Sequence, residues 1–284
     1  LTAGSAIVLV FVVLGLFGTV LAPYDPMMTD YGAIFDTPSS AHLFGTDHLG
    51  RDTLSRLLAG TKTTLGLALL ITIANIAIAM TVGSLSGFFG GRFDTIVMRV
   101  VDSLIALPGF LIAICFLGIF GGGIRNLAFF LIITGWAGLA RVIRNEVIVV
   151  KNMDFIVYNV SLGFGNARII LGHILPHVIP PLLIVFISSL IGELFSIVSL
   201  SFLGLGISPS TPEWGAILNN ARPYFLSSPS LLLFPTLFIF AIVFGLHLVA
   251  DGLRDFMDSK KLLIAGDDFT RYYTADETPI GDTP

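Results

Sequence analysis

The sequence predicts an all-α membrane protein with six transmembrane helices. The 284 residues are 55% hydrophobic and only 12% charged, with a mean hydropathy of +0.91, whereas soluble domains carry about 25% charged residues. Long apolar runs alternate with polar segments, and the first run is about long enough to cross a hydrocarbon core of ~30 Å. A soluble protein this apolar could not cover its surface with polar groups, so we expect the bilayer to be its solvent.

The predicted spans follow the apolar runs in chain order. They are residues 3–21, 65–88, 100–120, 127–142, 182–203 and 231–250. The first run could be the apolar region of a signal peptide, but no basic flank precedes it and further spans follow, so we interpret it as a signal anchor. Because the chain starts at Leu1, we expect a native N-terminus to precede it. In the second run, Gly83 and Gly87 have the small-residue spacing of closely packed helices.

The polar segments divide the chain into regions. Residues 1–22 are the first transmembrane anchor, and residues 23–61 are an extracytoplasmic loop, whose three prolines and five aspartates exclude a span. Residues 62–258 form a core of five spans with a cytoplasmic loop at 148–177. Residues 259–284 are acidic and poor in pattern, so we expect a disordered cytoplasmic tail.

The basic residues predict the orientation. With the loop 148–177 inside the cell, six spans place both termini in the cytoplasm. Ten basic residues then lie inside and five outside, as the positive-inside rule requires. The inner ones are Arg92, Arg99, Arg141, Arg144, Lys151, Arg168, Arg254, Lys260, Lys261 and Arg271, and the outer ones are Arg51, Arg56, Lys62, Arg125 and Arg222.

The longest polar interruption in the second half, residues 143–181, has the pattern of two short helices around a turn. We expect a helix over 152–162, a turn with positive φ at Gly163, and a second helix that Pro176 stops. Asp154, Tyr158 and Asn159 are the expected contact face, since residues four apart share a helix side. Such a loop is typical of a docking surface outside the membrane; the alternative is an amphipathic loop on the bilayer surface.

This loop resembles the coupling loop of ABC importer permeases, whose pattern is E-A-A-x-x-x-G followed by nine residues and I-x-L-P. Gly163 matches the glycine, and His173-Ile174-Leu175-Pro176 closes the motif. Two positions depart from the pattern: Val157-Tyr158-Asn159 replaces Glu-Ala-Ala, and His173 replaces isoleucine. The resemblance implies that polar and aromatic packing of Tyr158 and Asn159, or Asp154, supplies the usual acidic contact to the ATPase.

Two further strings resemble one branch of these permeases. Phe44-Gly45-Thr46-Asp47-His48-Leu49-Gly50-Arg51-Asp52 is similar to the F/L-G-T-D-x-x-G-R-D signature of the second permease subunit in the oligopeptide/dipeptide/nickel family. Its glycines allow tight turns, and its charged residues can form a local ion network; the alternative is a solvated loop without a partner. The string L-S-F-L-G-L-G at 200–206, followed by P-E-W-G at 212–215, resembles the same branch.

The resemblance implies a type I importer permease fold with a cytoplasmic coupling helix, in the plasma or inner membrane. It implies a heterodimer with a homologous second permease, two cytoplasmic ATPase subunits that bind ATP and Mg, and an extracytoplasmic solute-binding protein. This chain then holds no cofactor and forms half of an alternating-access pathway. The family allows dipeptides, oligopeptides, nickel or metal-chelator complexes as substrates. The net charge of −4 gives no reason to expect nucleic-acid binding.

Two acidic residues fall within predicted spans. Asp102 lies near a span end, where it can reach the interface, so we interpret it as structural rather than substrate-binding. Glu193 lies in mid-span, where an ionisable side chain costs ~2.5–3.5 kcal/mol to insert. It is expected to face a partner or a water-filled path, and the simpler alternative is an internal hydrogen bond that fixes the fifth span.

Two other classes of protein remain to be weighed. A self-sufficient secondary transporter or channel needs intramembrane ionisable groups, for which Asp102, Glu193 and His247 are the candidates, and no inverted repeat is evident. An intramembrane enzyme needs a nucleophile with a base, and no such pattern occurs. The chain lacks G-x-x-x-x-G-K-[ST], so we expect it not to hydrolyse ATP by itself.

Overall fold

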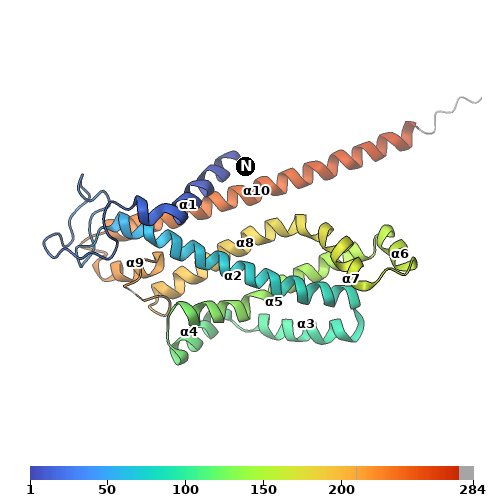
Figure 1. Ribbon diagram of the computed structural model, residues 1–284, viewed down its shortest axis with the longest axis horizontal. Coiled ribbons are helices and arrows are strands. Elements are labelled where there is room, and N and C mark those ends of the chain that lie inside the picture. Colours follow the sequence, from blue (N-terminus) through green and yellow to red (C-terminus); the bar gives the residue numbers. More distant parts are fainter. Residues whose placement is uncertain (209, 275–284) are drawn as a thin grey trace, which may run out of the picture.

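The computed structural model describes residues 1–208 and 210–274, with side chains up to residue 257, and this part of the chain is helical. The elements are α1 (Thr2–Leu21), α2 (Thr53–Phe89), α3 (Gly91–Ala106), α4 (Gly109–Phe120), α5 (Ile124–Lys151), α6 (Asp154–Ser161), α7 (Asn166–Ile169), the π-helix η1 (Ile170–Ile174), α8 (Leu175–Phe202), α9 (Trp214–Ala221), the 3-10 helix η2 (Arg222–Tyr224) and α10 (Ser230–Thr274). The long helices lie side by side, with the loop before α2 at one end of the molecule and α6 and α7 at the other (Figure 1).

Five helical segments are long and apolar enough to cross a membrane: α1, α2, α5, the run from α7 to α8, and α10 up to Met257. The predicted span 100–120 is wrong as a single helix, because α3 and α4 meet at 78°. The chain has five candidate spans, or six if this bent pair is one span. The cause is Pro108, which restricts the residue before it to extended conformations; Leu107 has φ −86° and ψ 137°.

The helix α2 begins at Thr53, so the loop predicted for 23–61 ends earlier than expected. Asp52 is the N-cap residue, and its Oδ2 accepts hydrogen bonds from the Ser55 amide at 2.8 Å and the Ser55 hydroxyl at 2.7 Å. This cap lets residues 53–64 form the first turns of a 37-residue helix.

Pro176 does not stop a helix, contrary to the prediction. The chain runs from α7 through η1 directly into α8, and Pro176 lies in the first turn of α8, where a missing amide proton is tolerated. The preceding π-helix bonds the Leu175 amide to the Ile170 carbonyl, five residues back, which widens the turn around the proline.

The predicted disordered tail is helical as far as the structure describes it. Residues 259–274 continue α10, and the rest of that prediction, residues 275–284, lies outside the described residues. No proline follows Pro235 until Pro279, and the sequence Lys260-Lys261-Leu262-Leu263 consists of good helix formers, so the helix has no local reason to end at residue 258.

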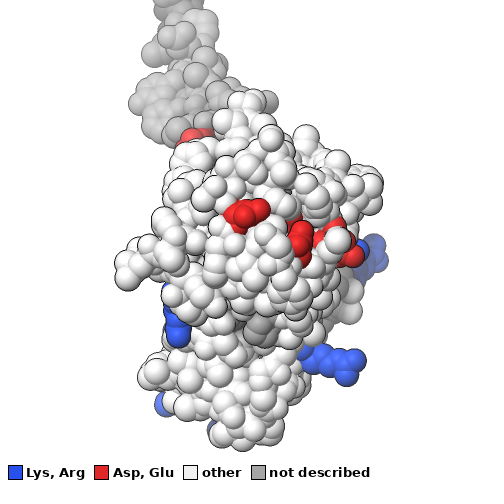
Figure 2. Space-filling view, turned by 90° about the vertical axis from the view of Figure 1, so that its left-hand side faces the viewer, with Lys and Arg blue, Asp and Glu red and all other residues white. Residues whose placement is uncertain are grey.

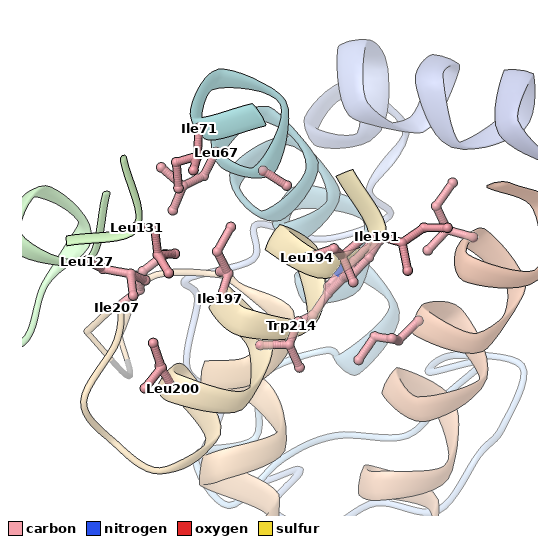
Figure 3. Packing of buried hydrophobic residues seen from close by; sticks show 14 of the residues in the cluster. Leu67, Ile71, Leu127, Leu131, Ile191, Leu194, Ile197, Leu200, Ile207 and Trp214 are labelled. Carbon is pink, nitrogen blue, oxygen red and sulfur yellow. The ribbon is translucent and has the colours of Figure 1, made fainter. Parts of the chain in front are cut away.

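Two apolar clusters hold the helices together. One joins α2, α5 and α8 to α9 and α10, through residues such as Leu67, Leu131, Leu194 and Trp214 (Figure 3). The other surrounds the opposite halves of α2, α5 and α8 and includes Ile143, Ile156 and Ile174. The helices α2 and α5 pack closely at the expected glycines: an added Cβ would lie 2.6 Å from the Ala140 carbonyl oxygen at Gly83 and 2.8 Å from the Arg144 carbonyl oxygen at Gly87.

Candidate functional site

The charged residues of the string 44–52 form the expected local ion network. Asp47 accepts hydrogen bonds from the amides of Leu49 at 2.9 Å and Arg51 at 3.0 Å. The Arg51 guanidinium binds the Asp47 carboxylate through two nitrogens at 2.7 Å each, and Arg56 approaches it at 3.8 Å. Asp52 contacts His42 Nδ1 at 3.0 Å besides capping α2. Asp47, Arg51 and Asp52 are buried, so this network orders the loop instead of meeting solvent.

The other residues of the string fix the path of the loop backbone. The Thr46 hydroxyl accepts from the Asp36 amide at 2.8 Å and donates to the Ala33 carbonyl. Gly45 and Gly50 both have φ +72°, and at each position a Cβ would strike the backbone of the preceding loop. Seen from this end, the molecular surface is mostly uncharged, with a few acidic side chains in the upper half and basic ones at the flanks (Figure 2).

Glu213 is a buried residue to which the sequence analysis assigned no role. Its carboxylate accepts hydrogen bonds from the Gly215 and Ala216 amides, both at 2.8 Å, and so caps α9. The next residue, Trp214, is fully buried, and its indole donates to the Leu57 carbonyl of α2 at 3.2 Å. Burial raises the pKa of the Glu213 carboxyl above its ordinary value. The capping pattern of Glu213 before a helix could have revealed this role.

The loop 148–177 contains the helix α6, within the range predicted for it. Ile156 is fully buried, whereas Asp154 and Tyr158 are exposed and Asn159 is half-buried, with its amide bound to the Phe155 carbonyl at 2.8 Å. Gly163 has φ +77°, as expected, and nothing lies near the position of a Cβ. Lys151 Nζ donates to the Phe88 carbonyl at 2.5 Å, which fastens the start of the loop to the end of α2. The structure thus presents Asp154 and Tyr158 on one exposed end of the molecule.

Ion pairs join α3 to α5 next to this loop. Asp94 binds the Arg144 guanidinium and accepts from the Ser86 hydroxyl at 2.5 Å. Asp102, predicted to be structural, pairs with Arg141. Both pairs line an open cavity of about 370 Å³, together with Arg99.

Glu193 lies among three helices. Its Oε1 accepts from Asn75 Nδ2 of α2 at 2.9 Å, and the same nitrogen donates to the Leu131 carbonyl of α5 at 3.2 Å. Gly135 of α5 leaves room for this contact, since a Cβ there would lie 2.9 Å from Glu193 Oε1. Neither Glu193 Oε2 nor Asn75 Oδ1 has a hydrogen-bond partner among the described residues. Glu193 lines two cavities, of about 410 and 350 Å³.

Comparisons with known proteins identify the family of the chain. Residues 79–262 match the family described as binding-protein-dependent transport system inner membrane component. The chain is 38% identical over 260 residues to the glutathione transport system permease protein GsiD of Pectobacterium atrosepticum, which covers 91% of this chain and 86% of the relative. It is also 38% identical over 254 residues to GsiD of Escherichia coli O6:K15:H31, with 89% and 84% covered.

A solved structure agrees with the fold. A chain of the MetNI methionine ABC transporter in an inward-facing conformation aligns with a TM-score of 0.54 and 16% identity, over 70% of this chain and 96% of that one. This likeness confirms the fold of an ABC importer permease. The family also excludes a self-sufficient transporter, because ATP is bound and hydrolysed by a partner ATPase. The chain therefore belongs to the inner-membrane permease components of binding-protein-dependent ABC importers, and within them to the second permease type of the peptide and glutathione branch.

Proposed function

We propose that this permease subunit conducts short peptides of the glutathione class into the cell. The observation that carries the proposal is the 38% identity, over about nine-tenths of the chain, to permeases named for glutathione transport. The family resemblance also allowed nickel and metal-chelator complexes. Neither has support from those relatives.

The subunit works within a larger assembly. As a component of a binding-protein-dependent system it acts with an ATPase, a binding protein and a partner permease. In our proposal the partner permease is homologous and completes a heterodimer, two ATPase subunits bind on the cytoplasmic side, and the binding protein delivers peptide to the outer side. The open cavities beside Glu193 support this arrangement, because a second permease is needed to enclose them.

The proposed orientation places α6 and both termini in the cytoplasm, with residues 23–52 outside. Asp154, Tyr158 and Asn159 then form the contact face for the ATPase, and Gly163 turns the chain away from it. Pro176 begins the return into the membrane. This assignment rests on the exposed position of α6 and on the distribution of basic residues. Closure of the ATPases on ATP would push α6 and reopen the pathway toward the other side.

Substrate competition tests the proposal. The complete complex is reconstituted into liposomes, and uptake of radiolabelled glutathione is measured against unlabelled dipeptides, tripeptides and Ni²⁺. We expect short peptides to compete and Ni²⁺ to have no effect. Uptake of radioactive nickel without any uptake of peptide would refute the proposed substrate class.

A further inference from the structure

Three open cavities follow one face of α5. Thr134, Gly138, Arg141 and Asn145 recur three or four residues apart, so they form one stripe along the helix. The cavity of about 410 Å³ includes Thr134, the one of about 350 Å³ includes Gly138, and the one of about 370 Å³ includes Arg141 and Asn145. The first two share Gly135, Glu193 and Ser196. We call this run of open cavities the α5 groove.

The groove has a hydrogen-bond acceptor at one level. Glu193 borders both cavities that meet at Gly135, and its surroundings on α3 and α4 are apolar side chains such as Leu104, Phe110 and Ala113. Asn75 satisfies only Oε1, while Oε2 is buried and has no hydrogen-bond partner among the described residues. A carboxylate in such an apolar setting is favoured by a cationic donor, and a substrate ammonium group brings three N–H donors.

Hydrogen-bond donors lie further along the same groove. Arg144 is occupied by Asp94 and Asn145, and Arg141 is paired with Asp102. The exposed Arg99 guanidinium lines the same cavity and makes no ion pair among the described residues. The three arginines outnumber the two aspartates of this cavity, so its net charge is positive and it suits an anionic group such as a carboxylate.

The separation of the two levels fits a short peptide. Gly135, beside the Glu193 carboxylate, and Arg141, which lines the same cavity as Arg99, are six residues apart on α5, which corresponds to about 9 Å along the helix. A fully extended tripeptide spans at most ~10 Å and a dipeptide ~7 Å. An arginine side chain is long and flexible enough to reach the carboxylate of either peptide. A single amino acid spans only about 3.5 Å and is too short to reach both levels.

We propose that the α5 groove binds both ends of a zwitterionic short peptide, with the ammonium group at Glu193 and the carboxylate at Arg99. The inference deepens the proposed function and rests on it: it assigns the charged ends of the substrate to two residues of this chain. It accounts for the placement of a carboxylate in mid-membrane and of an unpaired guanidinium at the same groove. The ion pair of Asp102 with Arg141 lines the same cavity as Arg99.

Cysteine protection tests the ammonium end directly. Ser189 lines the groove beside Glu193, so S189C is introduced together with C115A into the complete purified complex. The rate at which a maleimide modifies the introduced cysteine is followed by mass spectrometry, with increasing concentrations of a tripeptide or its N-acetylated form. We expect the free tripeptide to protect at a roughly tenfold lower concentration than the acetylated one, which corresponds to about 1.4 kcal/mol.

Variants at each end separate the two contacts. Glu193→Gln keeps an oxygen that accepts the hydrogen bond from Asn75. It should abolish the preference for the free tripeptide over its N-acetylated form, and Glu146→Gln is the control. Arg99→Gln should abolish the preference for a tripeptide over its C-terminal amide, with Arg92→Gln as control. Equal protection by all peptides, absence of protection, or unchanged preferences in both variants would refute the inference. If the wild-type complex still takes up peptide in liposomes, the proposed function stands; if it takes up none, that function fails as well.

Discussion

Asn75 Nδ2 lies 2.9 Å from Glu193 Oε1, and this hydrogen bond joins α2 to α8 in the middle of the helix bundle. The same amide nitrogen reaches the Leu131 carbonyl of α5 at 3.2 Å, so one side chain ties three helices together. The internal hydrogen bond considered from the sequence is therefore present, and the same glutamate also borders the groove. Glu193 therefore both stabilises the packing of the three helices and lines a cavity.

The contact among these helices depends on Gly135. Gly135→Ala would place a methyl group 2.9 Å from Glu193 Oε1 and still closer to the Asn75 amide, so the three-helix contact must open. We expect a loss of about 1–3 kcal/mol in stability, as for other overpacked sites. Gly138→Ala, where nothing lies within 4 Å of the added carbon, is the control. Thermal unfolding of the two purified variants measures the difference, and equal melting temperatures would contradict the contact.

The turn after α6 is predicted to tolerate only glycine. Gly163 has φ +77°, which a β-branched residue adopts at a cost of at least about 1–2 kcal/mol, whereas Gly165 has φ −65° and ψ 144°, which any residue adopts. Gly163→Val should therefore uncouple ATP hydrolysis from uptake or release the ATPase subunits, and Gly165→Val should do neither. Subunit retention and peptide-stimulated hydrolysis are measured on both complexes. Normal values for Gly163→Val would remove α6 from the coupling mechanism.

The orientation predicts which loops an impermeant thiol reagent reaches. Ser40 and Ser161 are both exposed and lie in the loop before α2 and in α6, respectively. In intact cells S40C should be labelled from outside and S161C should not, while disruption of the membrane should make both reactive. The reverse pattern would overturn the proposed topology together with the assignment of α6.

The loop before α2 is predicted to lose stability as the solution becomes acidic. Burial lowers the pKa of His48, and the neighbouring Arg51 and Arg56 add to this effect against the opposing effect of Asp47. The fold then favours neutral His48, so its contribution is present above the ordinary value of 6.5 and is lost as the pH falls below it toward the folded-state pKa. His48→Gln should show a smaller loss of stability than the parent protein over this interval. The measurement is the stability of each protein over this pH interval, and an equal loss of stability in both proteins would contradict the effect.

The sequence predicted the class of fold and most spans, because long apolar runs depend on composition alone. It was wrong at two prolines for opposite reasons: Pro108 breaks a predicted span through its effect on Leu107, whereas Pro176 enters the first turn of α8 after a π-helix. Such outcomes depend on the surrounding turns, which periodicity does not reveal. Asp52 was assigned to an ion network, but its position before Ser55 also makes it the cap of α2.

The candidate groove was only partly predictable. Glu193 was identified because a carboxylate in an apolar run is unusual, but its partner Asn75 is 118 residues away. The roles of Gly135 and Arg99 depend on how α3, α5 and α8 approach one another, and no local pattern gives that approach. Glu213 was quoted as part of a family string without a role, although its place before α9 is typical of a helix cap.

The most direct test is whether peptide passes along the α5 groove. S189C in a C115A background is reconstituted with all partner subunits, and half of the preparation is fully modified with a bulky maleimide. We predict that the unmodified complex takes up labelled tripeptide, and that the modified complex retains its ATPase subunits but takes up none. Undiminished uptake after complete modification would contradict a pathway along this face of the subunit.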